Sequence, residues 1–180
     1  MNRTELEHPE KPPKVLKSHC QVAIIDIKVG NYGGKWRMFM GSYDHSLDTK
    51  GRVIIPSKFR EALGEKFVIT NSLDPCLCVY DMPAWERFVQ KLTGLPYNTR
   101  KQRELVRFFL SNAIEVEPDK QGRILIPAKN RQHAHIDKNV IMMGVGARIE
   151  IWDPETYDKN AISDDMNEIA EELLGNGFEI

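Results

Sequence analysis

An internal repeat constrains the fold of this chain more than any other feature of its sequence. The segment DTKGRVIIPSKFR, residues 48–60, returns as DKQGRILIPAKNR, residues 119–131, at an offset of 119 − 48 = 71 residues. The likeness continues downstream, where VYD at 79–81 matches IWD at 151–153. We therefore expect a duplicated supersecondary unit, since two segments this similar fold most economically in the same way.

Each copy predicts a turn followed by a short strand. Asp48 and Asp119 stand at the first position of a β-turn, and Gly51 and Gly122 stand at the fourth, as type I turns prefer. RVIIP and RILIP are rich in β-branched residues and predict strands that the proline ends. After the first proline, SKFREAL predicts one or two helical turns that stop at a glycine.

Two further strands complete each unit. FVIT and CLCVYD are predicted strands in the first copy, and NVIMMG and RIEIWD are their counterparts in the second. A four-stranded unit of this size exposes an apolar face and is marginally stable alone. We therefore expect the two units to pack together and bury that face.

Helical sequence separates and follows the two units. MPAWERFVQKL, residues 82–92, and TRKQRELVRFFLSNA, residues 99–113, place apolar residues at spacings of three and four, and GLPYN breaks the pattern between them. We interpret the aromatic residues of both stripes as core. The stripes also exceed what two packed units need, which predicts oligomerisation. An acidic amphipathic helix is predicted at the end of the chain.

The net charge of −1 hides a segregation along the chain. Residues 1–37 hold seven basic and four acidic residues, and residues 38–149 hold 17 basic and 12 acidic residues, whereas residues 150–180 hold one lysine and ten acidic residues. A basic body is compatible with nucleic-acid binding but does not establish it. The acidic end is equally well explained as a solvated helix.

Membrane, metal and enzyme classes are disfavoured by the sequence. No segment approaches the roughly 20 consecutive apolar residues of a membrane span, and the polar start is unlike a secretory signal, which predicts a cytoplasmic protein. Cys20, Cys76 and Cys78 have no spacing that would close a tetrahedral metal site, so we expect reduced thiols and no metal. The five histidines lie in no catalytic motif, so we expect neither an enzyme nor a cofactor.

Positive charge is concentrated in the two repeated motifs. Arginine suits nucleic acid because its planar guanidinium can make two hydrogen bonds to a phosphate or a guanine edge. An arginine of the motif could instead pair with the aspartate of its own turn and fix the shape of that turn. The basic residues after each strand are more typical of solvated helix positions than of base contacts. The candidate DNA-binding residues are Arg52, Arg123, Lys50, Lys120, Lys58, Arg60, Lys129 and Arg131, and the motif-shaping residues are Asp48, Gly51, Asp119 and Gly122.

These tandem motifs resemble the MraZ family of bacterial transcriptional regulators and, more distantly, the SpoVT-AbrB DNA-binding domains. The resemblance rests on MFMGSYDHSLDTKGRVIIP at the head of the first copy, on the D-x-x-x-R signature in both copies and on their spacing, and it covers about residues 38–160. It implies an α+β, mainly β fold, in which two AbrB-like units form a pseudo-symmetric β-barrel with flanking helices.

The resemblance also implies a function. Proteins of this family assemble into rings, bind short G-rich direct repeats in double-stranded DNA upstream of their own gene, and regulate, usually by repression, their division and cell-wall operon. We therefore expect a homo-oligomeric ring that is associated with the nucleoid and has no membrane partner. A self-assembling interaction module without specific DNA binding stays open as the alternative, because basic patches can serve subunit contacts alone.

The repeat boundaries suggest how the chain is organised. The two copies differ where Lys120-Gln121 stands opposite Thr49-Lys50, so they need not bind DNA equally. The expected parts are an N-terminal extension at 1–37, a first unit at 38–84, connecting helices at 85–112, a second unit at 113–156 and an acidic C-terminal helix at 157–180.

We interpret residues 1–37 as the translated leader of the gene, with synthesis starting at Met38 or Met40. The codons of VGNYGGKW, residues 29–36, can spell three TGG-containing boxes at a period of about 10 nucleotides, one turn of B-DNA. Such an array is the kind of operator that the resemblance implies. A C at the third base of the Tyr32 codon would break it.

Overall fold

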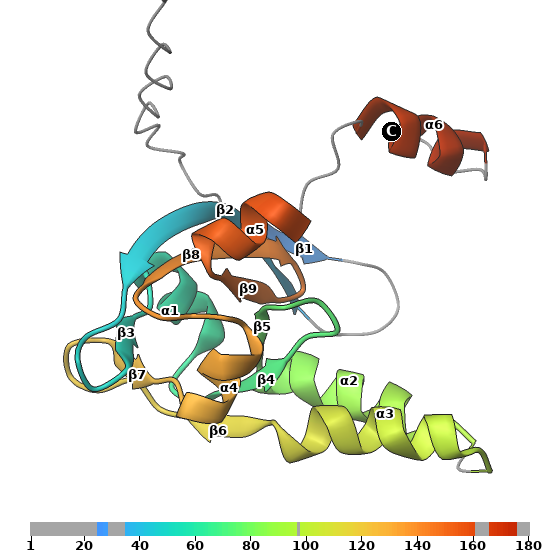
Figure 1. Cartoon of the computed structure of the whole chain (residues 1–180), viewed down its shortest axis with the longest axis horizontal. Coiled ribbons are helices and arrows are strands. Elements are labelled where there is room, and N and C mark those ends of the chain that lie inside the picture. Colours follow the sequence, from blue (N-terminus) through green and yellow to red (C-terminus); the bar gives the residue numbers. More distant parts are fainter. Residues whose placement is uncertain (1–24, 29–34, 97, 161–165, 176–180) are drawn as a thin grey trace, which may run out of the picture.

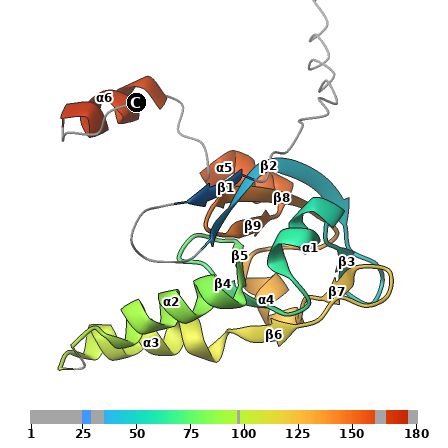
Figure 2. The same cartoon turned by 180° about the vertical axis from the view of Figure 1, so that it is seen from behind.

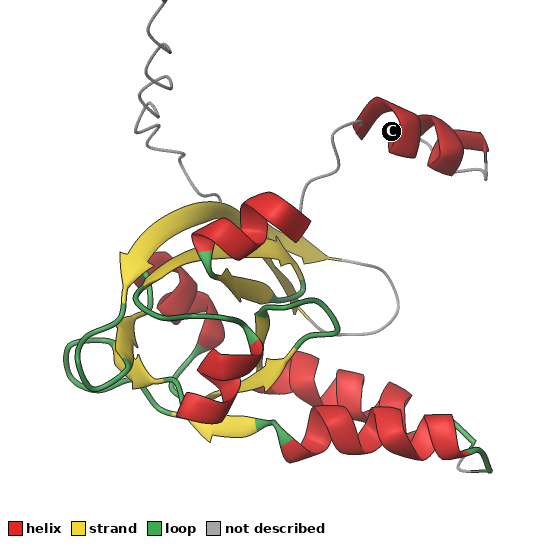
Figure 3. Cartoon of the chain, in the orientation of Figure 1, coloured by secondary structure: helices red, strands yellow, loops and turns green. Residues whose placement is uncertain are grey.

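The computed structural model describes residues 25–28, 35–96, 98–160 and 166–175, and it shows a mixed α+β fold whose strands lie mainly in one large antiparallel sheet (Figures 1 and 3). Seven strands form one antiparallel sheet in the order β1-β2-β8-β9-β5-β4-β6. The strands of this sheet are β1 (Ile25–Lys28), β2 (Lys35–Ser46), β4 (Phe67–Asn71), β5 (Leu77–Asp81), β6 (Ile114–Val116), β8 (Asn139–Gly146) and β9 (Ile149–Trp152).

The two remaining strands, β3 (Arg52–Ile54) and β7 (Arg123–Leu125), pair with each other in a separate antiparallel ribbon. Val53 lies opposite Ile124, its own counterpart in the repeat. The backbone bonds beyond this pair are reciprocal, because Ile55 N donates to Gly122 O at 3.0 Å and Ile126 N donates to Gly51 O at 3.1 Å. The ribbon therefore joins the two repeats through equivalent residues.

Both predicted β-turns are confirmed. Gly51 N donates to Asp48 O at 2.9 Å, and Gly122 N donates to Asp119 O at 2.8 Å. Both glycines have a positive φ, 77° for Gly51 and 76° for Gly122, which only glycine adopts without strain. Since each turn leads directly into a ribbon strand, these four residues set how the ribbon begins.

The short helices begin after the two prolines that end the ribbon strands, and longer helices follow the first unit. α2 and α3 form a hairpin that projects from the sheet (Figures 1 and 2). Their starts are capped: Asp81 Oδ1 accepts from Ala84 N at 2.7 Å, and Thr99 and Gln102 form a capping box. The helices are α1 (Ser57–Leu63), α2 (Met82–Thr93), α3 (Arg100–Ser111), α4 (Ala128–His133), α5 (Pro154–Asn160) and α6 (Met166–Gly175).

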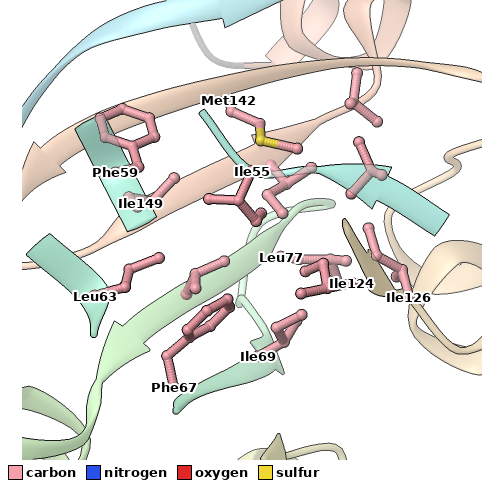
Figure 4. Packing of buried hydrophobic residues seen from close by; sticks show 14 of the residues in the cluster. Ile55, Phe59, Leu63, Phe67, Ile69, Leu77, Ile124, Ile126, Met142 and Ile149 are labelled. Carbon is pink, nitrogen blue, oxygen red and sulfur yellow. The ribbon is translucent and has the colours of Figure 1, made fainter. Parts of the chain in front are cut away.

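One continuous core is built from both repeats (Figure 4). The inner face of the ribbon contributes Val53 and Ile124, which are 1% and 2% exposed. Phe59 of α1 packs edge-on against Phe39 of β2, with ring centroids 6.0 Å apart. The expectation that the two units bury each other's apolar face is confirmed, and each such fully buried side chain contributes about 1.5–3 kcal/mol.

The strands do not form a closed barrel in the part of the chain that the structure describes. The large sheet ends at β1 on one side and β6 on the other, and these two strands do not pair. The ribbon strands are only three residues long, because Pro56 and Pro127 follow closely after them and cannot donate to a ladder. The α+β class was thus predicted correctly, whereas closure of the strands into a barrel is not observed.

The apolar stripes of α2 and α3 face each other across the hairpin. The buried residues of this contact are Leu92 of α2 and Val106 and Phe109 of α3. Phe88 packs edge-on against Phe109, with ring centroids 5.0 Å apart. The interpretation of the stripes as core is therefore confirmed in part, because Phe88, Leu105 and Phe108 are only half-buried. The oligomerisation expected from the stripes stays a prediction.

The N-terminal segment is only partly described. Strand β1 pairs with the start of β2, with Ile25 opposite Met38. Residues 1–24 and 29–34, which hold Cys20 and most of the predicted operator codons, lie outside the described residues. The proposed translation start stays a prediction.

Candidate nucleic-acid interface

The first turn is organised around the carboxylate of Asp48. Its Oδ1 accepts from the backbone N–H groups of Lys50 and Arg52, both at 2.9 Å. Its Oδ2 accepts from the Arg52 side chain, at 2.7 Å from Nε and 2.6 Å from Nη2. One oxygen thus holds the backbone of the turn, and the other holds the guanidinium.

The second turn repeats this arrangement atom for atom. Asp119 Oδ1 accepts from Gln121 N at 2.8 Å and from Arg123 N at 3.0 Å. Its Oδ2 accepts from Arg123 Nε at 2.8 Å and Nη2 at 2.7 Å. The ion pair that the sequence offered as an alternative role for each arginine is therefore present in both copies.

These contacts favour the charged form of both aspartates. The side-chain hydrogen bond from Arg52 is the largest cause that lowers the pKa of Asp48 from 3.8 to about 2, and the backbone bonds add to it. Arg123 lowers the pKa of Asp119 to about 2 in the same way. Both carboxylates are therefore ionised at neutral pH.

The ion pairs leave part of each guanidinium available. The side chains of Arg52 and Arg123 are 31% and 27% exposed. Among the described residues, neither Nη1 atom has a hydrogen-bond partner. Each aspartate therefore orients an arginine whose outer edge can still bind another group, and contact with DNA stays a prediction.

The lysines predicted to bind DNA are all exposed. Lys50 and Lys120 lie in the two turns but at different positions, because Lys50 aligns with Gln121 and Lys120 with Thr49. Lys58 lies on α1 and Lys129 on α4, each next to the ribbon strand of its own copy. The helix lysines therefore occupy equivalent positions in the two repeats, whereas the turn lysines do not.

Arg60 and Arg131 lie in a different environment from the solvated positions expected for them. Each is half-buried under the turn of the other repeat. A Cβ atom on Gly122 would lie 2.5 Å from Arg60 Cζ and 3.0 Å from its Nε, and a Cβ on Gly51 would lie 3.2 Å from Arg131 Cζ. A Cβ at position 122 would therefore displace the Arg60 guanidinium, whereas a Cβ at position 51 would only crowd Arg131, and both positions need glycine for its φ angle. We refer to these two contacts as the crossed arginines.

The crossed arginines are held differently. Arg131 Nε donates to Ile126 O at 3.2 Å, whereas Arg60 Nε is buried and has no partner among the described residues. Local sequence patterns could not reveal these contacts, because each joins one repeat to the other. The available signal was that Gly51 and Arg60 both have counterparts 71 residues later, at Gly122 and Arg131.

The arrangement suits an anionic polymer. The two turns lie at the same edge of the molecule and flank the ribbon (Figures 1 and 2). Arg52 and Arg123 lie on the outer face of this ribbon, because the residues next to them in each strand, Val53 and Ile124, are buried. The described residues contain no cluster of histidine, cysteine or acidic side chains that could hold a metal ion. No helix among them is long and apolar enough to cross a membrane.

A family model described as "MraZ protein, putative antitoxin-like" matches this chain twice, at residues 38–108 and 109–175. The two matches are consecutive, and each contains one of the two turns. The first match begins at Met38.

Curated proteins named "Transcriptional regulator MraZ" are similar to most of the chain. The relative from Caldanaerobacter subterraneus is 53% identical over 138 residues, which is 76% of this chain and 96% of the relative. Relatives from Clostridium acetobutylicum and Moorella thermoacetica are 50% and 48% identical, again over 76% of this chain and over 96% and 97% of their own length.

Replacing Gly122 by alanine should destabilise the fold through its contact with Arg60. We expect Gly122→Ala to lower the free energy of unfolding by about 1–2 kcal/mol from the left-handed backbone, with a further loss from contact with the guanidinium. In an Arg60→Ala background that further loss should disappear, giving a coupling of about 0.5–3 kcal/mol in urea unfolding. Arg131→Ala is the matched control, because it removes the arginine that lies under the other turn. An equal penalty in both backgrounds would contradict the contact.

The aspartates should make stability fall in acid. Their pKa values lie below the unfolded value, so the ion pairs contribute fully above about pH 5 and this contribution is lost as the pH falls through about 2. We expect a flat contribution between about pH 5 and 8, and a weaker acid dependence in Asp48→Asn than in the parent. Urea titrations at several pH values measure this, with Asp74→Asn as an exposed control. An unchanged acid profile in Asp48→Asn would count against the pairing.

Proposed function

The chain belongs to the MraZ family, and from this premise we propose that it is a transcriptional regulator that binds double-stranded DNA through the β3–β7 ribbon and its two turns. The observation that carries this proposal is the placement of Arg52 and Arg123 on the outer face of one short antiparallel ribbon. The major groove of B-DNA admits a two-stranded ribbon, and arginine is the residue that most often recognises guanine there.

The aspartates lower the entropy cost of this binding. An unrestrained arginine side chain loses conformational entropy when it binds. The Arg52 side chain is already held by two contacts to Asp48, so it has less entropy to lose. The exposed lysines around the ribbon supply the charge that draws the protein to phosphates. We propose Arg52 and Arg123 as the base-contacting residues and Lys50, Lys120, Lys58 and Lys129 as the phosphate-contacting residues.

The proposed target is a set of short G-rich direct repeats upstream of the chain's own gene. Binding there would repress the division and cell-wall operon and would place the protein at the nucleoid in the cytoplasm. Two arginine sites in one chain bind weakly, so affinity is expected to come from several subunits bound to several repeats. A homo-oligomeric ring provides that arrangement. Exposed apolar side chains on α6, namely Met166, Ile169 and Leu173, support a subunit contact.

We further propose that the two units, residues 38–84 and 113–156, are related by an approximate twofold axis through the Val53–Ile124 pair. The reciprocal backbone bonds of the ribbon and the crossed arginines support this relation.

Arg52→Ala should remove most specific binding. We expect a loss of about 1–3 kcal/mol per contacted base, measured in gel shifts with DNA from upstream of the gene. Arg100→Ala is the matched control, because it removes one positive charge from a side chain on α3 that is 85% exposed. Full affinity of a folded Arg52→Ala protein would refute the assignment and would favour the interaction module without specific DNA binding.

Light scattering tests the oligomer. We expect a mass several times that of the 20.7 kDa chain at micromolar concentration. A monomer at that concentration would contradict the ring and remove the avidity argument, while leaving the DNA-binding face intact.

A further inference from the structure

The outer face of the ribbon carries two aliphatic side chains beside its two arginines. Side chains alternate along each strand, so Val53 and Ile124 point into the core while the residues on either side of them point outward. Ile54 is 46% exposed and Leu125 is 54% exposed. Both are large apolar residues on a surface that is otherwise charged.

The pairing register places these four side chains in a checkerboard. Arg52 lies opposite Leu125, and Ile54 lies opposite Arg123. The two arginines therefore occupy one diagonal of the face, and the two aliphatic residues occupy the other. Directly opposite side chains are about 5 Å apart at Cβ, and successive outward positions on one strand are about 7 Å apart.

From this checkerboard we infer that Ile54 and Leu125 are specificity-determining residues that contact the 5-methyl groups of thymines next to the guanines bound by Arg52 and Arg123. The inference rests on the proposed DNA binding. The thymine methyl group is the one apolar group that a base edge presents in the major groove, and aliphatic side chains are its partners in direct readout.

The spacing sets where the thymines should stand. Base pairs rise by about 3.4 Å, so a separation of 5–7 Å between an arginine and an aliphatic residue corresponds to about two base-pair steps. Each thymine is thus expected within about two positions of a guanine. Boxes of the TGG type meet this condition.

A contact between subunits is the other use of exposed aliphatic residues. It conflicts with the checkerboard, because a protein surface that covered Ile54 and Leu125 would also cover the arginines beside them. Both arginines would then be withdrawn from DNA. A DNA base edge, by contrast, offers hydrogen-bond acceptors and methyl groups within the same few ångströms.

The experiment compares two DNA duplexes in a binding titration with the full chain. One duplex carries several TGG boxes at a spacing of about 10 base pairs, and the other carries deoxyuridine in place of the box thymines, which removes only the methyl groups. The parent protein should bind the deoxyuridine duplex at least about fourfold more weakly, the value expected for one lost methyl contact. Ile54→Ala and Leu125→Ala should each bind the thymine duplex more weakly and should discriminate less between the two duplexes.

Leu73→Ala is the matched control, because Leu73 is an exposed leucine in the β4–β5 turn, away from the ribbon, and its loss should leave the discrimination unchanged. Thermal melting shows whether each variant is folded. Equal binding of the thymine and deoxyuridine duplexes by the parent protein, with binding lost in Arg52→Ala, would overturn the inference and leave the proposed function standing. If Leu125→Ala changed the oligomeric mass but still distinguished the thymine duplex from the deoxyuridine duplex as the parent protein does, the inference would be overturned in favour of a subunit contact. Failure of the parent protein to bind either duplex would overturn both the inference and the proposed function.

Discussion

Backbone hydrogen bonds between β3 and β7 join the two repeats. Each repeat contributes one strand to this ribbon, so neither repeat can form it alone. The pairing of Val53 with Ile124 turns one face of the ribbon toward the core and the opposite face toward solvent. The same register brings each turn next to the short helix of the other copy, so that an arginine from that helix fills the space beneath it. Burial of the core, the shape of the turns and the outward direction of the two D-x-x-x-R arginines therefore all depend on this one ladder of three residue pairs.

Local patterns predicted the elements well, because local interactions determine them. Asp48 and Gly51 define a turn within four residues, and the hydrogen bonds that form it run between neighbours in the chain. Pro56 ends a strand whatever the rest of the chain does. The pairing of Asp48 with Arg52 was likewise offered by a spacing of four residues, and the structure contains it. The candidate site was therefore visible in the sequence as a list of residues.

Contacts between the repeats were not visible in the same way. No sequence pattern indicated the register of β3 against β7, and without that register Arg60 and Arg131 look like ordinary solvated helix residues. Strand β6 was not predicted, because it is only three residues long. Its sequence, IEV, is too short for an alternation of apolar and polar residues to indicate a strand. The buried amide of Asn130, whose Nδ2 donates to Asn71 Oδ1 at 2.9 Å and to Asn112 O at 3.0 Å, was also missed, since its partners lie on distant elements.

The position of Asn130 shows what it means for both repeats to lie in one chain. Its counterpart at the offset of 71 is Phe59, and both side chains are buried, at 1% and 0% exposure. One repeat fills this place with an aromatic ring and the other with a hydrogen-bonded amide. Two identical subunits would have to accept the same residue on both sides of their axis. In a single chain that contains both repeats, a mutation changes only one of the two equivalent positions. The two halves can therefore diverge independently. Specialisation of one half for anchoring and of the other for discrimination is thereby open to selection.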